Sequence, residues 1–218
     1  MINRPKMLNE RQETRAERFF SALCTLAVIL LVAFTIFNLW FVNTYFIVEV
    51  DGVSMENTLL NGDALYAKRV NFFFSAERGD VVVINVKQYG LFDEDTERVI
   101  KRLIAVEGDT VKCEHGVVWR DTGNGYEQLD EPYAKGVTPD FEEVKVGFGQ
   151  IFFLGDNRPI SKDSTEVGCL YYADIVGVVS EEEIEKVISK REKENNESLH
   201  FFEDTRRQIM IKKELYLW

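Results

Sequence analysis

The feature of this chain that most constrains its folding is an uncharged stretch of 24 residues, from Phe19 to Val42, which reads FFSALCTLAVILLVAFTIFNLWFV. As a helix rising about 1.5 Å per residue, this stretch exceeds the roughly 30 Å thickness of a hydrocarbon core. A buried helix of a water-soluble protein is usually shorter and carries a polar stripe. We therefore predict a transmembrane anchor over residues 19–42.

The residues at the end of this stretch distinguish a permanent anchor from a cleaved leader. A cleaved leader ends in small residues, in an Ala-x-Ala pattern. Here the exit contains the bulky aromatic residues Trp40, Phe41 and Tyr45, which are typical of the interface between lipid and water. The anchor is therefore predicted to be retained.

Basic residues lie on one side of the predicted anchor. Five precede Phe19, whereas no Lys or Arg follows Val42 before Lys68. The five are Arg4, Lys6, Arg11, Arg15 and Arg18. Because basic flanks stay in the cytoplasm, we predict a single-pass protein of the cell membrane. Residues 1–18 would form a cytoplasmic tail, and residues 43–180 an extracytoplasmic domain.

Composition excludes several classes of function. The formal net charge is −11, and an acidic domain lacks the basic face that a nucleic-acid partner needs. Cys24 lies in the predicted anchor, and the sequence leaves open whether Cys113 and Cys169 form a disulfide. The isolated His115 and His200 do not have the spacing of metal ligands, so we expect no metal site and no cofactor.

Short β-branched runs, separated by Gly and Asp turns, dominate residues 48 to 180. They are Val81–Val86, Arg98–Val106, Val117–Trp119, Ile151–Leu154 and Ile175–Val179. This pattern predicts a mostly β domain with antiparallel strands. The stretch from Asp121 to Gly149 is richer in Gly, Pro and acidic residues, which predicts an insertion or a long loop.

Residues 181–218 are predicted to form a charged C-terminal tail. Its first part, residues 181–198, is dense in charge and indicates a short surface helix with Ile184, Val187 and Ile188 as its apolar stripe. The last twenty residues mix aromatic and basic side chains. The sequence leaves open whether they bind a membrane or a partner, pack on the domain, or form a disordered end.

Two segments carry a candidate nucleophile and a candidate base. Ser54 lies in a Gly-containing loop just beyond the anchor, where a serine is more often a turn residue than a nucleophile. Lys101 lies in the strand-like run from Val99 to Val106. Strand alternation puts Lys101 on one face with Val99, Leu103 and Ala105. Arg102 then shares the opposite face with Ile100, Ile104 and Val106.

Two environments are open to Lys101. Strand lysines more often lie exposed at a sheet edge. If Lys101 is buried instead, desolvation lowers its pKa from about 10.4 towards neutrality. A neutral amine can act as the general base for a serine hydroxyl, and no histidine is then needed.

A third segment, from Leu154 to Ser164, follows a strand-like run. It holds Gly155, Asp156, Asn157, Arg158, Ser161 and Asp163. A hydroxyl in such a segment can hold a lysine amine in position, and Asp/Arg pairs can brace a site electrostatically. Taken by itself, the segment would pass for a polar loop.

Together the three segments resemble bacterial type I signal peptidases, the membrane-anchored serine–lysine enzymes that cut signal peptides from exported proteins. The resemblance covers the anchor and roughly residues 48–179. It rests on four motifs, which occur in this order: Gly52-Val53-Ser54-Met55 with Thr58-Leu59, Arg78-Gly79-Asp80-Val81-Val82, Lys101-Arg102 with Gly108-Asp109, and Gly155-Asp156-Asn157-Arg158 with Ser161, Asp163 and Ser164. It implies an antiparallel β catalytic domain behind one N-terminal transmembrane helix.

The resemblance also implies a role for each matching residue. Ser54 would be the nucleophile, Lys101 the general base and then the acid, and Ser161 the group that orients the lysine. The backbone N–H of Ser54 would be one oxyanion donor. Similar enzymes can use a serine hydroxyl as the second donor, where this chain has Gly52. Met55 completes the nucleophile motif, and the predicted structural braces are Arg102, Asp156, Arg158 and Asp163.

Two positions depart from the family pattern. Asn57 stands where Pro is usual, so the turn after Ser54 lacks a fixed φ. Thr165 stands where Arg is usual, so Asp163 lacks its expected cationic neighbour. These departures alone favour the alternative function, a catalytically silent or narrowly dedicated homologue that binds or processes one secreted substrate. The presence of Ser54, Lys101 and Ser161 argues against it.

The implied partners follow from the same resemblance. They are the signal peptides of exported preproteins, membrane lipid and the secretion machinery. A signal peptide would add to the domain as an extended strand and be cut after small residues in the Ala-x-Ala pattern.

Overall fold

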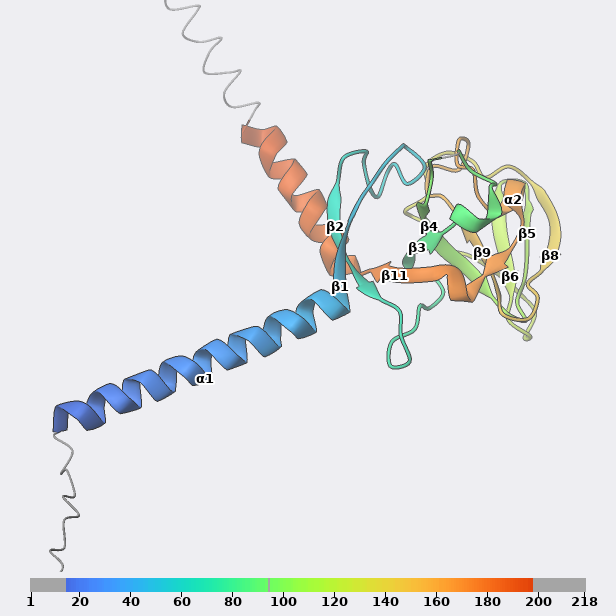
Figure 1. Ribbon diagram of the computed structural model, residues 1–218. Helices are drawn as coiled ribbons and strands as arrows, with labels where there is room; N and C mark the ends of the chain where they lie inside the picture. The colour runs from blue at the N-terminus through green and yellow to red at the C-terminus, as the bar shows by residue number, and fades with distance from the viewer. Residues whose placement is uncertain (1–14, 94, 198–218) are drawn as a thin grey trace, which may run out of the picture. The chain divides into compact units, whose positions relative to one another are not determined.

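The computed structural model describes residues 15–93 and 95–197, which form two compact units divided between Thr44 and Tyr45. The predictions for residues 1–14 of the cytoplasmic tail, for His200 and for the last twenty residues lie outside the described residues. The two units are the helix α1 and a β unit that begins at Tyr45 (Figure 1).

Helix α1 runs from Arg15 to Thr44. It begins four residues before the predicted anchor and ends two residues after it. None of its residues is buried against protein, and its length and composition suit a membrane crossing. Its polar side chains bond within the helix: Thr35 Oγ1 donates to Leu31 O, and Asn38 Nδ2 donates to Phe34 O. The helix therefore leaves these polar groups satisfied while its apolar side chains face outward.

The β unit contains, among the described residues, a seven-stranded sheet and a four-stranded sheet in which neighbouring strands pair antiparallel. The larger sheet has the order β1-β2-β11-β3-β4-β9-β10. Its strands are β1 (Tyr45–Glu49), β2 (Ala64–Arg69), β3 (Val81–Asn85), β4 (Arg98–Val106), β9 (Gln150–Leu154), β10 (Leu170–Tyr171) and β11 (Ile175–Val179). The prediction of a mostly antiparallel β domain is thus confirmed.

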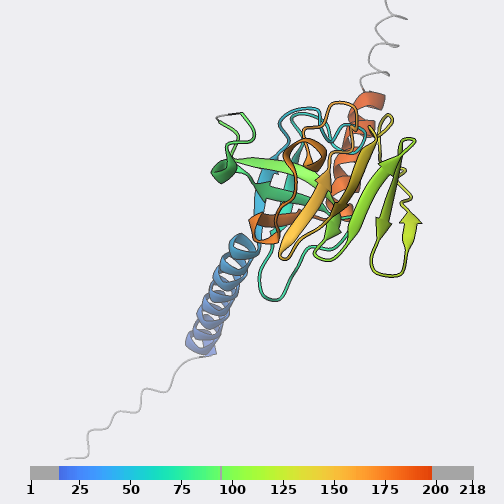
Figure 2. The same cartoon turned by 90° about the vertical axis from the view of Figure 1, so that its right-hand side faces the viewer.

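The smaller sheet has the order β7-β6-β5-β8 and lies beside the larger sheet (Figure 2). Its strands are β5 (Thr110–Glu114), β6 (Val117–Asp121), β7 (Tyr126–Gln128) and β8 (Phe141–Lys145). The prediction of a loop or insertion from Asp121 to Gly149 is wrong in part, because β7 and β8 lie inside that stretch. Strand β8 reads FEEVK, and only Phe141 and Val144 pack on the core, so its charges hid the strand pattern.

Three short helices lie between strands of the described β unit. They are η1 (Lys87–Tyr89), α2 (Ser164–Val167) and η2 (Tyr172–Asp174). A further helical segment, residues 181–197, follows β11 and belongs to the β unit (Figure 1). It has the apolar stripe expected of it, since Ile184, Val187 and Ile188 pack into one core cluster. Residues 181–197 therefore pack on the core of the β unit through this stripe.

Strand β4 lies in the middle of the larger sheet, between β3 and β9. Its bounds, Arg98–Val106, are those predicted. The predicted alternation holds as far as Leu103, which shares a core cluster with Val99. It is wrong beyond Leu103, because the pairing with β9 shifts register between Leu103 and Ala105, and Ala105 packs in a different cluster with Ile104.

The cysteines of the described residues are free thiols, and Cys113 and Cys169 do not form a disulfide. Both pack in or against the cluster between the two sheets, which also contains Phe152 and Val118. Cys113 is buried and Cys169 is half-buried, which indicates a packing role as small apolar side chains.

Candidate active site

The nucleophile candidate Ser54 lies in the loop of residues 50–63, which joins β1 to β2. The loop is closed at its base, where the Val50 N–H donates to Asp63 O and the Gly62 N–H donates to Val50 O. Met55, next to Ser54, is buried in the core together with Leu59. The loop therefore fixes Ser54 at the boundary between the core and solvent, where its side chain is half-buried.

Lys101 is buried on the central strand β4, with only 3% of its surface exposed, so the edge position considered for it is wrong. Its Nζ atom donates a hydrogen bond to Ser161 Oγ over 3.0 Å. Burial lowers the pKa of Lys101 from its ordinary 10.5 to about 8, although the nearby carboxylates of Asp163 and Asp156 act in the opposite direction. A substantial fraction of the amine is therefore neutral in mildly alkaline solution.

Gly155 brings Ser54 and Ser161 together. It follows β9, and a Cβ built on it would lie 2.1 Å from Ser161 Oγ and 2.5 Å from the carbonyl oxygen of Ser54. These approaches are closer than any side chain tolerates, so only glycine fits between the nucleophile loop and the Ser161 hydroxyl. The motif glycine is thus explained by close packing at the site.

Asn157 connects the segment after β9 to the nucleophile loop. Its backbone N–H donates to Ser54 O over 3.0 Å, and its Nδ2 donates to Val53 O over 3.0 Å. Both carbonyls beside the candidate nucleophile are held in this way. The sequence motif contained Asn157, but no role was assigned to it, because its partners lie about a hundred positions away.

Arg102 and Asp156 form a buried ion pair behind the site. Arg102 Nε donates to Asp156 Oδ1 over 2.9 Å, and a terminal guanidinium nitrogen donates to Oδ2 over 2.6 Å. The Thr58 hydroxyl donates to Asp156 Oδ2 as well, and the Arg102 guanidinium lies 3.7 Å from the centre of the Tyr133 ring. The pair therefore links β4 to the nucleophile loop through Thr58.

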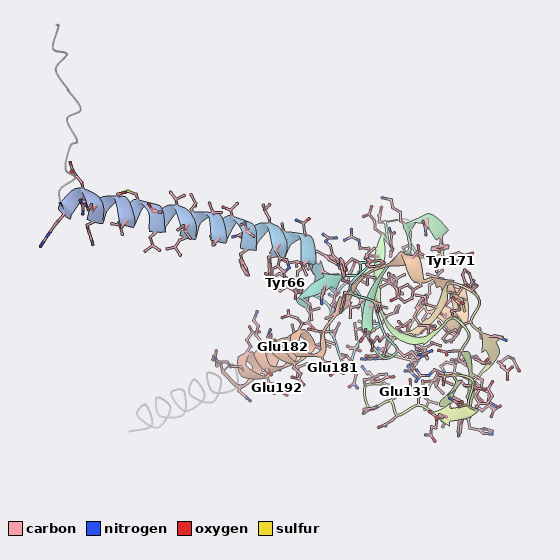
Figure 3. The ribbon with its side chains drawn as sticks, turned by 90° about the horizontal axis from the view of Figure 1, so that it is seen from below. Tyr66, Glu131, Tyr171, Glu181, Glu182 and Glu192 are labelled. Carbon is pink, nitrogen blue, oxygen red and sulfur yellow. The ribbon has the colours of Figure 1, made fainter. Side chains whose placement is uncertain are left out.

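Arg158 is braced from the segment between β7 and β8. Its guanidinium donates to both carboxylate oxygens of Glu131, over 2.9 and 2.7 Å, and to the Thr138 hydroxyl. Its Nε donates to Gly155 O. Figure 3 labels Glu131 on this segment, which sequence reasoning treated as an insertion. Glu131 and Tyr133 were missed, because no local pattern pairs them with Arg158 or Arg102.

Asp163 caps the short helix α2. Its Oδ1 accepts hydrogen bonds from the N–H and the hydroxyl of Thr165, and its Oδ2 accepts one from the Gly155 N–H. Thr165 therefore supplies a partner for Asp163 in place of the absent cationic neighbour. The hydrogen bond from the Gly155 N–H to Asp163 also connects this cap to the segment that carries Ser161.

Asn57 occupies a backbone conformation that proline cannot adopt. Its φ is +102°, in a region that side chains other than Asn, Asp and Gly rarely enter. Its Nδ2 donates to Tyr133 O over 3.0 Å. The turn after Ser54 thus differs in backbone conformation from one that contains proline, and a side-chain hydrogen bond holds it.

Ser54 and Lys101 line the same cleft, with a volume of about 690 Å³. Two stretches form most of its lining, residues 47–55 and residues 95–101, and Phe92, Asp93, Ile160 and Lys162 complete it. The first stretch includes part of β1 and the second includes the start of β4, so backbone edges flank the opening. Such a cleft suits an extended chain better than a compact ligand.

Two backbone N–H groups bear on oxyanion stabilisation. The Gly52 N–H donates to Asn61 Oδ1 over 2.8 Å and is thereby engaged. Within residues 15–93 and 95–197, the Ser54 N–H donates no hydrogen bond. It is therefore available to a group bound in the cleft.

Within the part of the chain that the structure describes, no group of three or more His, Cys, Asp or Glu side chains is arranged to hold a metal ion. Two lysines line the cleft, Lys101 and Lys162, and Lys101 is the buried one.

A family model described as signal peptidase, peptidase S26, matches residues 19–182. The chain belongs to this family. All the site residues predicted from the sequence lie inside the matched region of the S26 family, and the matched region ends at residue 182, just after the start of the last described helix.

Individual S26 relatives agree with the family match. Signal peptidase I of Bacillus licheniformis is 38% identical over 127 residues, which are 53% of this chain and 63% of that protein. Probable signal peptidase I-1 of Synechocystis is 34% identical over 131 residues, which are 57% of this chain and 63% of that protein. The match thus spans slightly less than two thirds of the length of either relative.

One further sequence relative and one solved structure are also similar to this chain. Thylakoidal processing peptidase 1, chloroplastic, of Arabidopsis thaliana is 32% identical over 137 residues, which are 59% of this chain and 39% of that protein. Among solved structures, a signal peptidase I from Enterococcus faecalis is 28% identical and aligns with a TM-score of 0.40, covering 49% of this chain and 98% of that one.

Proposed function

We propose that this protein is a membrane-anchored serine endopeptidase that cleaves signal peptides from exported preproteins, with Ser54 as the nucleophile and Lys101 as the general base. The observation that carries the proposal is the environment of Lys101. Its amine is almost fully buried, bonded to Ser161 and in the same cleft as Ser54. Burial with a lowered pKa is what a lysine needs to accept a proton near neutral pH.

The chemistry follows from these groups. Ser54 Oγ attacks the scissile carbonyl carbon, and its proton passes to the neutral Nζ of Lys101. The oxyanion accepts a hydrogen bond from the Ser54 N–H. Collapse breaks the C–N bond, and Lys101 returns the proton to the leaving amine. Water then attacks the acyl-enzyme and loses a proton to Lys101. Lys101 passes this proton to Ser54 Oγ as the ester bond breaks, which releases the signal peptide with a free carboxylate and restores both groups.

Ser161 acts as a positioning residue in this scheme. Its hydroxyl accepts one N–H of Lys101, which leaves the amine lone pair to face the nucleophile. The pairs Arg102–Asp156 and Arg158–Glu131 hold the supporting loops in place and do not touch the reacting atoms.

The cleft and the helix support the proposed substrate. An extended peptide adds as a strand along the backbone edges of the cleft, and the small side chains of its Ala-x-Ala pattern, which precede the cut, pass close to Gly52 and Ser54. Helix α1, with its exposed apolar side chains, holds the enzyme at the membrane from which signal peptides emerge. The positive flank at Arg15 and Arg18 favours a cytoplasmic N-terminus and an extracytoplasmic site.

The decisive experiment is cleavage of a preprotein with an Ala-x-Ala site by the detergent-solubilised full chain. Ser54→Ala and Lys101→Ala should each abolish cutting, whereas Ser75→Ala and Lys112→Ala should cut like the parent, since both side chains lie away from the cleft. No cutting by a folded parent would overturn the proposal. Cutting that survives Lys101→Ala at neutral pH would overturn the role of the base.

A further inference from the structure

The helical segment of residues 181–197 shares a core cluster with the loop that carries Ser54. Ile184, Val187 and Ile188 of this segment share a core cluster with Met55 and Leu59 of the loop. Met55 is the residue next to Ser54, and it is buried to 1% exposure. The packing of the helix therefore bears on the position of the nucleophile.

An ion pair joins the same helix to the base of the loop. Arg191 donates to Asp63 Oδ2, and both side chains are largely shielded, at 26% and 15% exposure. That carboxylate oxygen also accepts the Leu60 N–H over 2.7 Å, and the Asp63 carbonyl accepts the Val50 N–H. Asp63 is thus hydrogen-bonded to Arg191 of the helix, to Leu60 of the loop and to Val50, which follows the end of β1.

A third contact fixes the helix on the larger sheet. Glu183 Oε2 accepts the Tyr66 N–H over 3.3 Å. Strand β11 ends at Val179, which pairs with Ala67 of β2. Tyr66 is the next residue of β2 and lies just beyond this pairing. Figure 3 labels Tyr66 on β2 and Glu181, Glu182 and Glu192 on the helix. The helix therefore bonds to β2 at the position just after the pairing with β11 ends.

We propose that residues 181–197 are a positioning element for the nucleophile, acting through Met55 and Asp63. All but the first two of these residues lie beyond the match to the S26 family, which ends at residue 182. The inference rests on the proposed peptidase function for its kinetic consequences. A shift of the loop by a fraction of an ångström moves Ser54 relative to Lys101, because the lysine lies on the central strand β4, which is paired with β3 and β9.

The test uses Arg191→Ala in the full chain, with Lys190→Ala as the matched control. Lys190 is the neighbouring residue, is exposed and pairs only loosely with Glu194 of the same helix. Arg191→Ala should lower kcat for the preprotein by roughly ten- to a hundredfold, while KM and the pH midpoint set by Lys101 stay unchanged. Arg191→Lys should recover most of kcat, since it keeps the charge beside Asp63. Lys190→Ala should behave like the parent.

Amide hydrogen exchange gives a readout that does not depend on activity. In Arg191→Ala, the amides of residues 58–63 should exchange faster, while those of β3 and β4 keep their protection. An unchanged kcat together with unchanged exchange would overturn the inference, as would an equal loss in Lys190→Ala. If the parent does not cleave preproteins, the proposed function fails, but faster exchange confined to the loop would still support the contact. General loss of protection, with a lowered melting temperature, would show a merely structural helix and overturn the positioning role.

Discussion

The Nζ atom of Lys101 lies 3.0 Å from the Oγ atom of Ser161, although the two residues are 60 positions apart. Their contact depends on β4 and β9 lying side by side, since Ser161 follows the end of β9. Buried amines seldom persist without such a partner. The contact therefore explains how the sheet accommodates a lysine in its core.

The pH dependence of hydrolysis should follow the buried amine. Burial lowers the pKa of Lys101 to about 8, and the amine acts only when neutral. We expect kcat/KM for the preprotein to rise with pH and to reach half its plateau near pH 8. A midpoint near 10.4, the ordinary lysine value, would show that Lys101 is not desolvated in solution.

A charge substitution near Lys101 tests the cause of this midpoint. The carboxylate of Asp163 raises the pKa of Lys101, against the larger effect of burial. Asp163→Asn should therefore move the midpoint to lower pH. Asp130→Asn, at an exposed position, serves as the control and should leave it in place.

Replacing the lysine by an apolar residue should separate stability from activity. Because the pKa of Lys101 is lower in the folded state, the unfolded chain binds the proton more tightly, and the lysine destabilises the fold below about pH 8. That cost fades as the pH rises from 8 towards 10.5. Lys101→Met should thus be inactive, yet more stable at pH 6 by up to about 3 kcal/mol. Denaturant unfolding at pH 6 and pH 10 measures the free energy of unfolding of the parent and of Lys101→Met. A variant less stable than the parent at pH 6 would contradict the expectation.

Adding one methyl group at Gly155 should disable the site more than it disturbs the fold. Its Cβ would meet Ser161 Oγ at 2.1 Å and Ser54 O at 2.5 Å, so both residues would be displaced. We expect Gly155→Ala to lower kcat by at least about a hundredfold. Gly177→Ala is the matched control, because its Cβ would clash with the Phe46 ring away from the cleft. It should lower the melting temperature and keep kcat per folded molecule.

Restoring the usual family residue at position 57 should harm this protein. Asn57 has a φ of +102°, whereas proline requires about −65°. Asn57→Pro should therefore destabilise the fold by about 1–3 kcal/mol, through strain and the lost bond to Tyr133 O. Asn57→Gly tolerates this backbone angle and should stay within about 1 kcal/mol of the parent. Thermal unfolding distinguishes the two, and a stabilised proline variant would contradict the observed turn.

The parts of the fold predicted from the sequence are those in which local pattern and burial agree. Strand β4 is central and apolar on both faces, and its predicted bounds are the observed ones. Strand β8 was missed, because two of its five residues are glutamates that face solvent. The register shift after Leu103 could not be foreseen, since it depends on the pairing with β9 and not on β4 alone.

The supporting residues of the site show the same division. Ser54, Lys101 and Ser161 were identified from motifs, and the structure brings Lys101 and Ser161 into contact. Glu131 and Tyr133 were not identified, because their partners Arg158 and Arg102 are about thirty positions away along the chain. Short-range spacing carries no information on such pairs. Asn157 had a motif position but no role until its bonds to residues 53 and 54 were known.

Lys101 and Arg102 are consecutive on β4, and they point to opposite sides of the sheet, one towards Ser161 and the other towards Asp156. A molecule in which β4 paired one residue out of step would offer the nucleophile a guanidinium, which cannot give up its proton near neutral pH. Such a misfolded molecule would be inert, however compact it was. If the proposed peptidase activity holds, specific activity after refolding counts the molecules whose central strands are correctly aligned, and hydrolysis becomes a sensitive assay of strand pairing in this sheet.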